Sequence, residues 1–283
     1  MNRALELGQD LGRLTWDYLR SSWKGWTDDP RFADVSAYCM FIGYPRSGHS
    51  IIGALLDAHP HIVIAHEMGA LQYVHARFNR QQLYYLLAQK ARRDANNGRR
   101  SGSYSYQVEG QWQGRAQSMR VIGDNQAEGA TLRLRARPWL WNRLQSITNA
   151  PILLVHVTRN PFDNITTMAQ HAADRGNSDL EAAAAHYFSL CETVMRLKEH
   201  VDSRTIIDLS HEEFVADPSA SLRTLCRFFG LEPSDEYLDA CAEIVYDTPH
   251  KSRYEESWEQ RLRQKVQRRM DEIPYLRHYG FED

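Results

Sequence analysis

Short apolar runs alternate with longer amphipathic segments along most of this chain. The apolar runs predict buried strands at 38–43, 62–65, 119–122, 152–158 and 205–209. The amphipathic segments predict helices at 50–58, 69–78, 81–93, 131–146, 162–172, 180–200, 218–229 and 234–246. Short strands that alternate with helices are typical of a parallel sheet covered on both faces. The pattern therefore predicts an α/β fold, and without a repeat or linker we expect one domain over 1–283.

Two segments differ from this alternation. Residues 3–26 carry spaced leucines and three tryptophans, which predicts an amphipathic helix within an N-terminal helical extension, 1–36. We expect this helix to pack on the main domain; a membrane surface or a partner is the alternative. Residues 79–118 form the second segment, in which 94–103 is polar, basic and glycine-rich. We interpret 94–103 as a mobile loop, and a substrate-binding lid over an anionic ligand as the alternative. Basic residues between Tyr84 and Trp112 favour an anionic substrate, because this segment is expected to contact the substrate.

Composition narrows the class of protein. The net charge of −2 over 283 residues gives no general footprint for nucleic acid or an anionic membrane. No apolar run reaches the roughly 18 residues that cross a bilayer, and the N-terminus lacks the apolar centre of a secretory signal. The four cysteines show no C-x-x-C pairing, which predicts buried free thiols and a reduced, cytoplasmic setting. The oligomeric state remains open.

The segment GYPRSGHS, residues 43–50, nearly matches the phosphate-binding pattern G-x-x-x-x-G-K-[ST]. A strand precedes it and a helix follows, so backbone N–H groups at the helix start can converge on an anion. The lysine position holds His49, and the strong cation, Arg46, comes three residues earlier. This departure disfavours an ATP-dependent kinase or NTPase, which stays as an alternative.

A second anion site is predicted at residues 155–168. The strand 152–158 delivers Arg159 at its carboxyl end, where ligands of α/β proteins bind. Asn160 suits a helix cap and Pro161 the first helical position. Arg159 and Thr167 can then face the same side, and a guanidinium with a hydroxyl can bind a phosphate. A structural salt bridge at Arg159 is the alternative.

Together the two segments resemble the sulfotransferase family. Its members carry a strand–loop–helix like YPKSGTTW or PRSGTT, and later an element like RNPxDxxxS. GYPRSGHS and RNPFDNITT match both in order, and HEEFVADP at 211–218 resembles the family's YEDLVADP. The resemblance covers about residues 38–255 and implies a P-loop-type sheet. It also implies 3′-phosphoadenosine 5′-phosphosulfate (PAPS) as donor and adenosine 3′,5′-bisphosphate (PAP) as product, with no required metal.

The resemblance implies a role for each matching residue. Arg46 would stabilise charge on the leaving oxygen. The donor's 5′-phosphosulfate would lie on Arg46, Ser47, Gly48, His49 and Ser50. The 3′-phosphate would lie on Arg159 and Thr167, under a basic loop that comprises Lys251, Ser252 and Arg253; a surface charge cluster is the alternative for that loop. His211 replaces a tyrosine of the adenine pocket, and Ile51 replaces a stacking tryptophan of the cytosolic small-molecule enzymes.

The acceptor's proton needs a base. LDAHP at 56–60 followed by Glu67 resembles the subset that includes tyrosylprotein sulfotransferases, in which a glutamate at that place is catalytic. We expect Glu67 to be the base, with His66 as its rival; a structural role for Glu67 at the next helix is the alternative. Asp124 could orient substrate or hold a turn, and Asp57 and His59 could organise a helix end.

Three readings of function remain at this point. The first is a sulfotransferase that acts on a hydroxyl or amine of a carbohydrate, a peptide or a small metabolite. The second is a P-loop kinase or NTPase. The third is a catalytically silent nucleotide-binding protein on the same fold, which the presence of both Arg46 and Arg159 disfavours.

Overall fold

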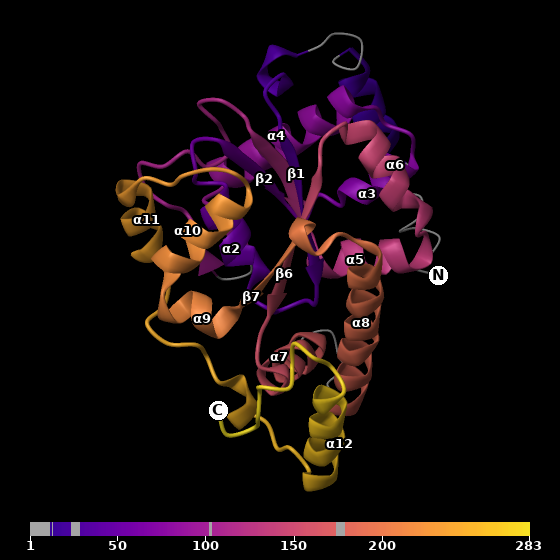
Figure 1. Ribbon diagram of the computed structural model, residues 1–283, viewed down its shortest axis with the longest axis vertical. Coiled ribbons are helices and arrows are strands. Elements are labelled where there is room, and N and C mark those ends of the chain that lie inside the picture. Colours follow the sequence, from indigo (N-terminus) through magenta and orange to yellow (C-terminus); the bar gives the residue numbers. More distant parts are fainter. Residues whose placement is uncertain (1–11, 13, 24–28, 102–103, 174–178) are drawn as a thin grey trace.

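The structure is a computed structural model that describes residues 12, 14–23, 29–101, 104–173 and 179–283. Within these residues a sheet of five parallel strands runs through the centre, in the order β2-β5-β1-β6-β7 (Figure 1). The strands are β1 (Ala37–Gly43), β2 (Ile62–His66), β5 (Val121–Asn125), β6 (Ile152–Thr158) and β7 (Ile206–Ser210). All their pairings are parallel, so the predicted α/β fold is confirmed.

Helices cover both faces of the sheet. They are α2 (His49–Leu56), α3 (Ala70–His75), α4 (Arg80–Asn96), α5 (Ala127–Ala136), α6 (Trp139–Thr148), α7 (Pro161–Ala173), α8 (Leu180–His200), α9 (His211–Ala216), α10 (Pro218–Phe228), α11 (Asp235–Ala242) and α12 (Gln260–Asp271). In Figure 1, α2, α9, α10 and α11 lie on one side of the sheet and α5, α6 and α8 on the other. The short strands β3 (Arg100–Ser101) and β4 (Tyr104–Ser105) form a separate hairpin.

Strand β1 shows how the sheet separates two cores. Tyr38, Met40 and Ile42 belong to one hydrophobic cluster, whereas Cys39 and Phe41 belong to the other. Successive strand residues point to opposite faces, and every residue of β1 is buried. A strand that is apolar at every position is therefore required here, which is why the sequence pattern identified it.

Several predicted bounds need correction. The expected helix 131–146 is two helices, because Pro138 lacks an N–H and forces Arg137 into an extended conformation, φ −145°. The strand expected at 119–122 lies at Val121–Asn125. The sequence analysis missed α9, a six-residue helix, and α12, which buries only Val266 and Met270 and has too few apolar positions for a periodic signal.

The interpretation of 94–103 as a loop is also corrected in part. Helix α4 continues to Asn96, and Arg100–Ser101 is a strand; residues 102–103 lie outside the described part. Arg99 is buried and pairs with Asp57 at 2.6 Å (Nη2 to Oδ2). The Asp57 carboxylate also accepts hydrogen bonds from the backbone N–H groups of Ile64 and Gly114, at 2.8 and 2.7 Å. This ion pair joins the end of α2 to the segment after α4, so Asp57 organises this corner of the fold.

The N-terminal helix is described at residues 12 and 14–23, and the rest of the expected 3–26 lies outside the described residues. It packs on the main body: the Tyr73 hydroxyl donates to Asp17 at 2.7 Å, and Tyr18 meets Phe78 edge-on. Trp16 and Trp23 are exposed. No helix in the described part of the chain is long and apolar enough to span a membrane. All four cysteines are buried and free, as predicted.

Removal of one partner of the Asp57–Arg99 pair should destabilise the protein strongly. Asp57→Ala leaves a buried guanidinium without its counter-charge, and such losses typically cost about 3–5 kcal/mol. We expect urea unfolding to report a fall of that size. Arg223→Ala, which removes an exposed pair with Asp235, is the matched control and should unfold near the wild-type midpoint. Equal effects of the two substitutions would contradict a structural role for the buried pair.

Candidate active site

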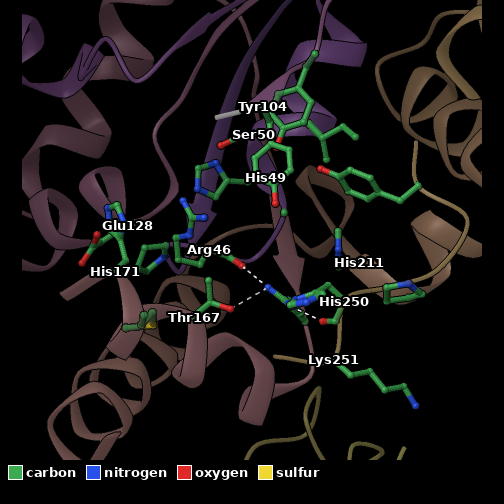
Figure 2. Close-up of a pocket in the computed structure, with 18 of the residues that line it drawn as sticks. Arg46, His49, Ser50, Tyr104, Glu128, Thr167, His171, His211, His250 and Lys251 are labelled. Atoms are coloured by element: carbon green, nitrogen blue, oxygen red, sulfur yellow. Dashed lines mark hydrogen bonds between the residues drawn. The ribbon is translucent and has the colours of Figure 1, made fainter. Parts of the chain in front are cut away.

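A cavity of about 1210 Å³ opens at the carboxyl ends of the parallel strands (Figure 2). Four residues that line it follow four different strands: Arg46 after β1, Glu67 after β2, Arg159 after β6 and His211 after β7. Ligands of open α/β sheets bind at this edge. The sheet topology therefore brings together side chains that are up to 165 positions apart in the sequence, from Arg46 to His211.

The loop between β1 and α2 forms the floor of the cavity. Gly48 precedes α2 with φ of 93°, a left-handed conformation that favours glycine. A Cβ at this position would also lie 2.3 Å from His211 Nδ1, so Gly48 allows His211 to approach the loop. Arg46 has φ of 64° although it is not glycine, and its exposed side chain lines the cavity. Ser47 is buried and its hydroxyl donates to Tyr44 O, so it does not line the cavity.

His49 is held by a residue that the sequence analysis did not single out for the site. Its Nδ1 lies 2.7 Å from Asn125 Oδ1, and Asn125 Nδ2 donates to His49 O at 2.8 Å. Burial lowers the pKa of His49 below its usual value. Asn125 ends β5, on the opposite side of β1 from β6. No sequence spacing connects residues 49 and 125, so only the strand order could have identified this pair.

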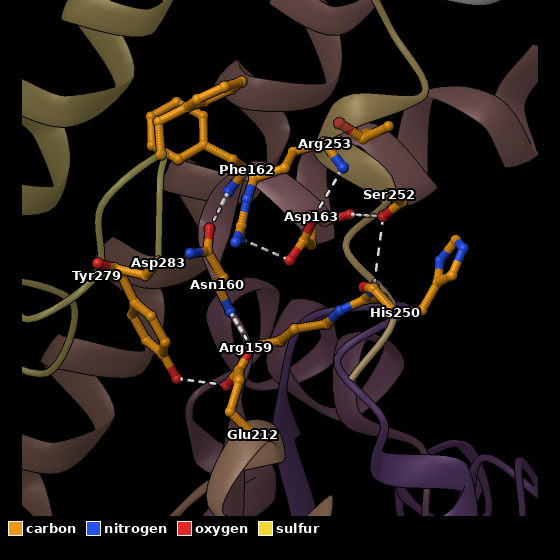
Figure 3. A network of polar contacts seen from close by, with 12 residues as sticks. Arg159, Asn160, Phe162, Asp163, Glu212, His250, Ser252, Arg253, Tyr279 and Asp283 are labelled. Carbon is orange, nitrogen blue, oxygen red and sulfur yellow. Dashed lines mark hydrogen bonds and ion pairs between the residues drawn. The ribbon is translucent and has the colours of Figure 1, made fainter. Parts of the chain in front are cut away.

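Arg159 is a buried cation whose hydrogen bonds all go to neutral oxygen atoms (Figure 3). Its side chain is 7% exposed, and its guanidinium donates to His250 O at 2.6 Å and to Arg46 O at 3.3 Å. Thr167 and Ser252 place their hydroxyl oxygens 3.4 Å away. Among the described residues Arg159 makes no ion pair, and burial lowers its pKa. An anion would supply the missing charge.

The segment 251–253 lies between α11 and α12, and its three residues are placed differently. Lys251 is exposed and lines the cavity. Ser252 is buried beside the arginine, with its hydroxyl 2.9 Å from that of Thr167. Arg253 does not line the cavity: it is 1% exposed and donates to Asp163 Oδ2 at 2.8 Å (Figure 3). Its ion pair with Asp163 ties the segment to α7 instead.

Glu67 and His66, the two candidate bases, differ in their access to the cavity. Glu67 is exposed, lines the cavity and has φ of 49°, a left-handed conformation that costs a non-glycine residue about 1–2 kcal/mol. His66, the last residue of β2, does not line the cavity, whereas Glu67, which follows the strand end, does. Asp124 holds the turn after Glu67 by accepting the backbone N–H groups of Met68, Gly69 and Ala70. Burial raises the pKa of Asp124 to about 6.

Three tyrosines line the end of the cavity beside Ile51. Tyr104 and Tyr106 stack with centroids 6.2 Å apart, and Tyr246 meets Tyr104 edge-on at 6.1 Å. The sequence analysis missed them as a group, because Tyr246 follows a different helix. The basic residues of 84–112 do not line this cavity; Arg92, for example, lines a separate one of about 720 Å³. The lining of this cavity therefore gives no support for an anionic acceptor from those basic residues.

The opposite end of the cavity is lined by Glu67 with Glu128, His171 and His186. His186 Nε2 lies 2.6 Å from Glu128 Oε1. Figure 2 shows Glu128 and His171 on one side of Arg46 and His211, His250 and Lys251 on the other. Arg46 thus stands between a cationic end and an end that holds carboxylates and imidazoles.

Comparison with known proteins decides the family. The model of the sulfotransferase family matches residues 40–236, which is more than half of the chain and includes both anion-binding segments. The chain belongs to the sulfotransferase family. Its activity is the transfer of a sulfuryl group, and its α/β fold is that of sulfotransferases. No curated protein sequence matched the chain.

Solved sulfotransferase structures share this fold at low sequence identity. Sulfotransferase STF9 from Mycobacterium avium superposes with a TM-score of 0.56 at 12% identity, over 94% of this chain and 81% of that one. The sulfotransferase domain from the curacin biosynthetic pathway gives 0.54 at 12% identity, over 85% and 97%. Mouse sulfotransferase SULT7A1 complexed with PAP gives 0.50 at 11% identity, over 84% of each chain.

If Arg159 is part of an anion-binding site, inorganic phosphate should bind there and stabilise this sulfotransferase against thermal unfolding. Ligand that binds only the folded state adds about 2.7 kcal/mol at a concentration of 100 Kd. We expect the thermal unfolding midpoint to rise with phosphate at constant ionic strength and pH. Arg159→Gln should lose most of that rise, whereas Arg204→Gln, an exposed control, should retain it. An equal rise in all three proteins would show that phosphate acts elsewhere.

Proposed function

We propose that this sulfotransferase takes its sulfuryl group from PAPS and transfers it to a hydroxyl or amine by in-line displacement. One observation carries the proposal: a buried guanidinium without an anionic partner, Arg159, lies beside a phosphate-binding loop. Two neighbouring anion sites suit a donor with a 3′-phosphate and a separate 5′-phosphosulfate. The likeness to a mouse enzyme complexed with PAP supports the same donor.

The two phosphates would occupy different parts of the cationic end. The 5′-phosphosulfate would lie on the start of α2, where the N–H groups of Gly48 and Ser50 and the Ser50 hydroxyl are available to an anion. The 3′-phosphate would bind Arg159 and Thr167, with Ser252 beside them and Lys251 at the rim. Arg253 would act indirectly, through its ion pair with Asp163.

The adenine would lie at the tyrosine end. Ile51 cannot stack on the adenine as a tryptophan would. The rings of Tyr104, Tyr106 and Tyr246 can, because aromatic faces stack well on nucleobases. His211 lines the same end, and its buried Nδ1 has no hydrogen-bond partner among the described residues. Burial lowers the pKa of His211 to about 4, so it is neutral and can pair with a neutral base.

The chemistry would take place around Arg46. Its guanidinium makes no hydrogen bond or ion pair within the described residues and can follow charge as it develops on the leaving oxygen. The acceptor would enter from the end lined by Glu67 and Glu128, and its proton would leave toward Glu67. Carbohydrate, peptide and small-metabolite acceptors all fit this description. His66 has no such access to the acceptor.

A P-loop kinase is less well supported. The lysine of an NTP-hydrolysing loop reaches the β- and γ-phosphates, but His49 is short, buried and bound to Asn125. A silent nucleotide-binding protein would have no need for a strained Glu67 in the cavity, because strain of this kind concentrates at functional sites.

The donor site is tested by calorimetric titration with PAP. We expect micromolar binding without added metal, and a loss of at least tenfold in affinity for Arg159→Ala, because the 3′-phosphate loses its buried cation. ATP with Mg²⁺ should bind more weakly than PAP. A preference for ATP–Mg²⁺, or PAP binding that ignores Arg159, would favour the kinase reading.

The acceptor side is tested by Glu67→Gln. We expect kcat for PAP release from PAPS to fall at least 100-fold, because loss of a catalytic acid–base group typically costs about 10²–10⁴. PAP affinity should change less than threefold, since Glu67 lies away from Arg159. Glu213→Gln, on the exposed side of α9, is the control. Unchanged turnover in Glu67→Gln would remove Glu67 from the mechanism.

A further inference from the structure

His49 occupies the place of a phosphate-binding lysine but is bonded away from that task. Its ring is 6% exposed and lines the cavity, with Nδ1 turned toward Asn125 at 2.7 Å. Nε2, on the other edge of the ring, makes no hydrogen bond to a described residue and is not among the fully buried polar atoms. Nε2 is therefore the ring nitrogen that a bound molecule can reach.

The two hydrogen bonds with Asn125 fix the tautomer of His49. A backbone carbonyl oxygen only accepts hydrogen bonds, so the Asn125 atom that lies 2.8 Å from His49 O must be the amide nitrogen. The other amide atom is then the oxygen, which also only accepts. Nδ1 must therefore carry the proton, and in the neutral ring Nε2 presents a lone pair.

The fold reserves space for this arrangement. A Cβ on Gly53, one turn along α2, would lie 2.2 Å from Asn125 Nδ2, so only glycine lets the amide reach the loop. Asn125 itself is 1% exposed. A glycine inside a helix costs roughly 0.5–1 kcal/mol relative to alanine. Gly53 thus makes α2 less stable, and the Asn125 amide is buried; together they orient the imidazole of His49.

The surroundings of His49 favour a neutral ring in the resting enzyme, and some of its neighbours stabilise the ring once it is protonated. Burial lowers its pKa, and Arg46 in the loop lowers it further. Asn125, Glu67 after β2 and Glu128 on α5 oppose this by stabilising the cation. His66, at the end of β2, also interacts with His49. Arg46, Glu67 and Glu128 are therefore the charged neighbours of His49 that also line the cavity.

A lone pair at Nε2 cannot bind the donor. Every oxygen of an ionised phosphosulfate is a hydrogen-bond acceptor, so none of them can satisfy Nε2. An acceptor hydroxyl or amine carries the proton that Nε2 needs. We infer that His49 Nε2, in place of Glu67, receives the acceptor's proton, with Asn125 and Gly53 as positioning residues; the inference rests on the proposed donor and reaction and revises only the identity of the base.

The proposed transfer forms one bond to sulfur and breaks another. The acceptor oxygen or nitrogen forms a bond to sulfur while its proton moves to His49 Nε2. The bond between sulfur and the bridging oxygen breaks, and its electron pair leaves on the 5′-phosphate of PAP, near Arg46. The Glu67 carboxylate stabilises the imidazolium that forms. His49 would thus take the proton with its Nε2 lone pair, and the charge of Glu67 would act through His49 by stabilising the protonated ring.

Nuclear magnetic resonance of ¹⁵N-histidine-labelled protein tests the tautomer without any acceptor. The His49 signals are identified by their absence in His49→Gln. At pH 7 we expect a protonated Nδ1 and an unprotonated Nε2 in the wild type, and mixed tautomers in both Asn125→Ala and Gly53→Ala. Gly53→Ala is informative because it acts only by displacing Asn125. A protonated Nε2 in the wild type at pH 7 would overturn the inference.

Turnover distinguishes this inference from the function on which it rests. PAP release from PAPS is followed with water, sugars, phenols and amines as acceptors. His49→Gln should retain PAP binding within threefold and lose at least 100-fold in kcat. His200→Gln, on the exposed end of α8, should match the wild type. Absence of both PAP binding and turnover in the wild type would reject the proposed function; full turnover in His49→Gln would reject only the inference.

The pH profile separates His49 from Glu67. A histidine base works in its neutral form, so activity should rise through the pKa of His49 and level off; that limb should lie below pH ~6.5. Glu67→Gln should move the limb to lower pH, because the carboxylate no longer stabilises the imidazolium. His49→Gln should abolish the limb. If Glu67→Gln abolishes it and His49→Gln leaves it in place, Glu67 is the base.

Discussion

The site depends on one buried cation. Arg159 joins three segments through neutral oxygens: Arg46 O in the loop, Thr167 on α7 and His250 O near the C-terminus. Removal of a guanidinium from water costs several kcal/mol, and hydrogen bonds to neutral acceptors offset only part of that cost. The fold therefore assembles three segments around a cation that forms no ion pair with a described residue, although the nearby Asp163 and Glu212 carboxylates partly stabilise it. Because the same guanidinium binds Arg46 O, an anion that binds there also orders the loop that carries Arg46.

Two residues hold unfavourable backbone conformations on either side of the reacting region. Arg46 and Glu67 both have positive φ, and neither is glycine. The Arg46 turn is fixed by Arg159, and the Glu67 turn by Asp124, which accepts three backbone N–H groups. In each case a buried charged side chain stabilises a strained turn that presents another charged side chain to the cavity. If Arg46 serves the leaving oxygen and Glu67 the acceptor side, as proposed, both side chains are thus held by equivalent means.

The sequence predicted what depends on local pattern. The strands of the sheet were predictable because both faces are buried, and Arg46, Arg159 and Thr167 because they stand at fixed offsets from strand ends. The split at Pro138 was also readable, since proline breaks a helix. Asn125, Gly53 and the three tyrosines were not predictable as site residues, because their roles depend on strand order and on contacts between distant segments. The divergence of His66 and Glu67 was not predictable either, because Glu67 follows the strand end in a left-handed conformation, to which strand alternation does not apply.

His49 shows why a departure from a motif should be interpreted with its spatial neighbours. In a nucleotide-hydrolysing loop, a lysine at this position supplies charge to the donor. In the proposed function that charge comes from Arg46 and Arg159, so position 49 is free of the requirement for a cation. A neutral histidine whose Nδ1–H is fixed by an amide has only a lone pair at Nε2, so it cannot donate a hydrogen bond to the donor there and can accept a proton. The same loop can thus hold the donor through its backbone and serve the acceptor through one side chain, which couples donor binding to placement of the base.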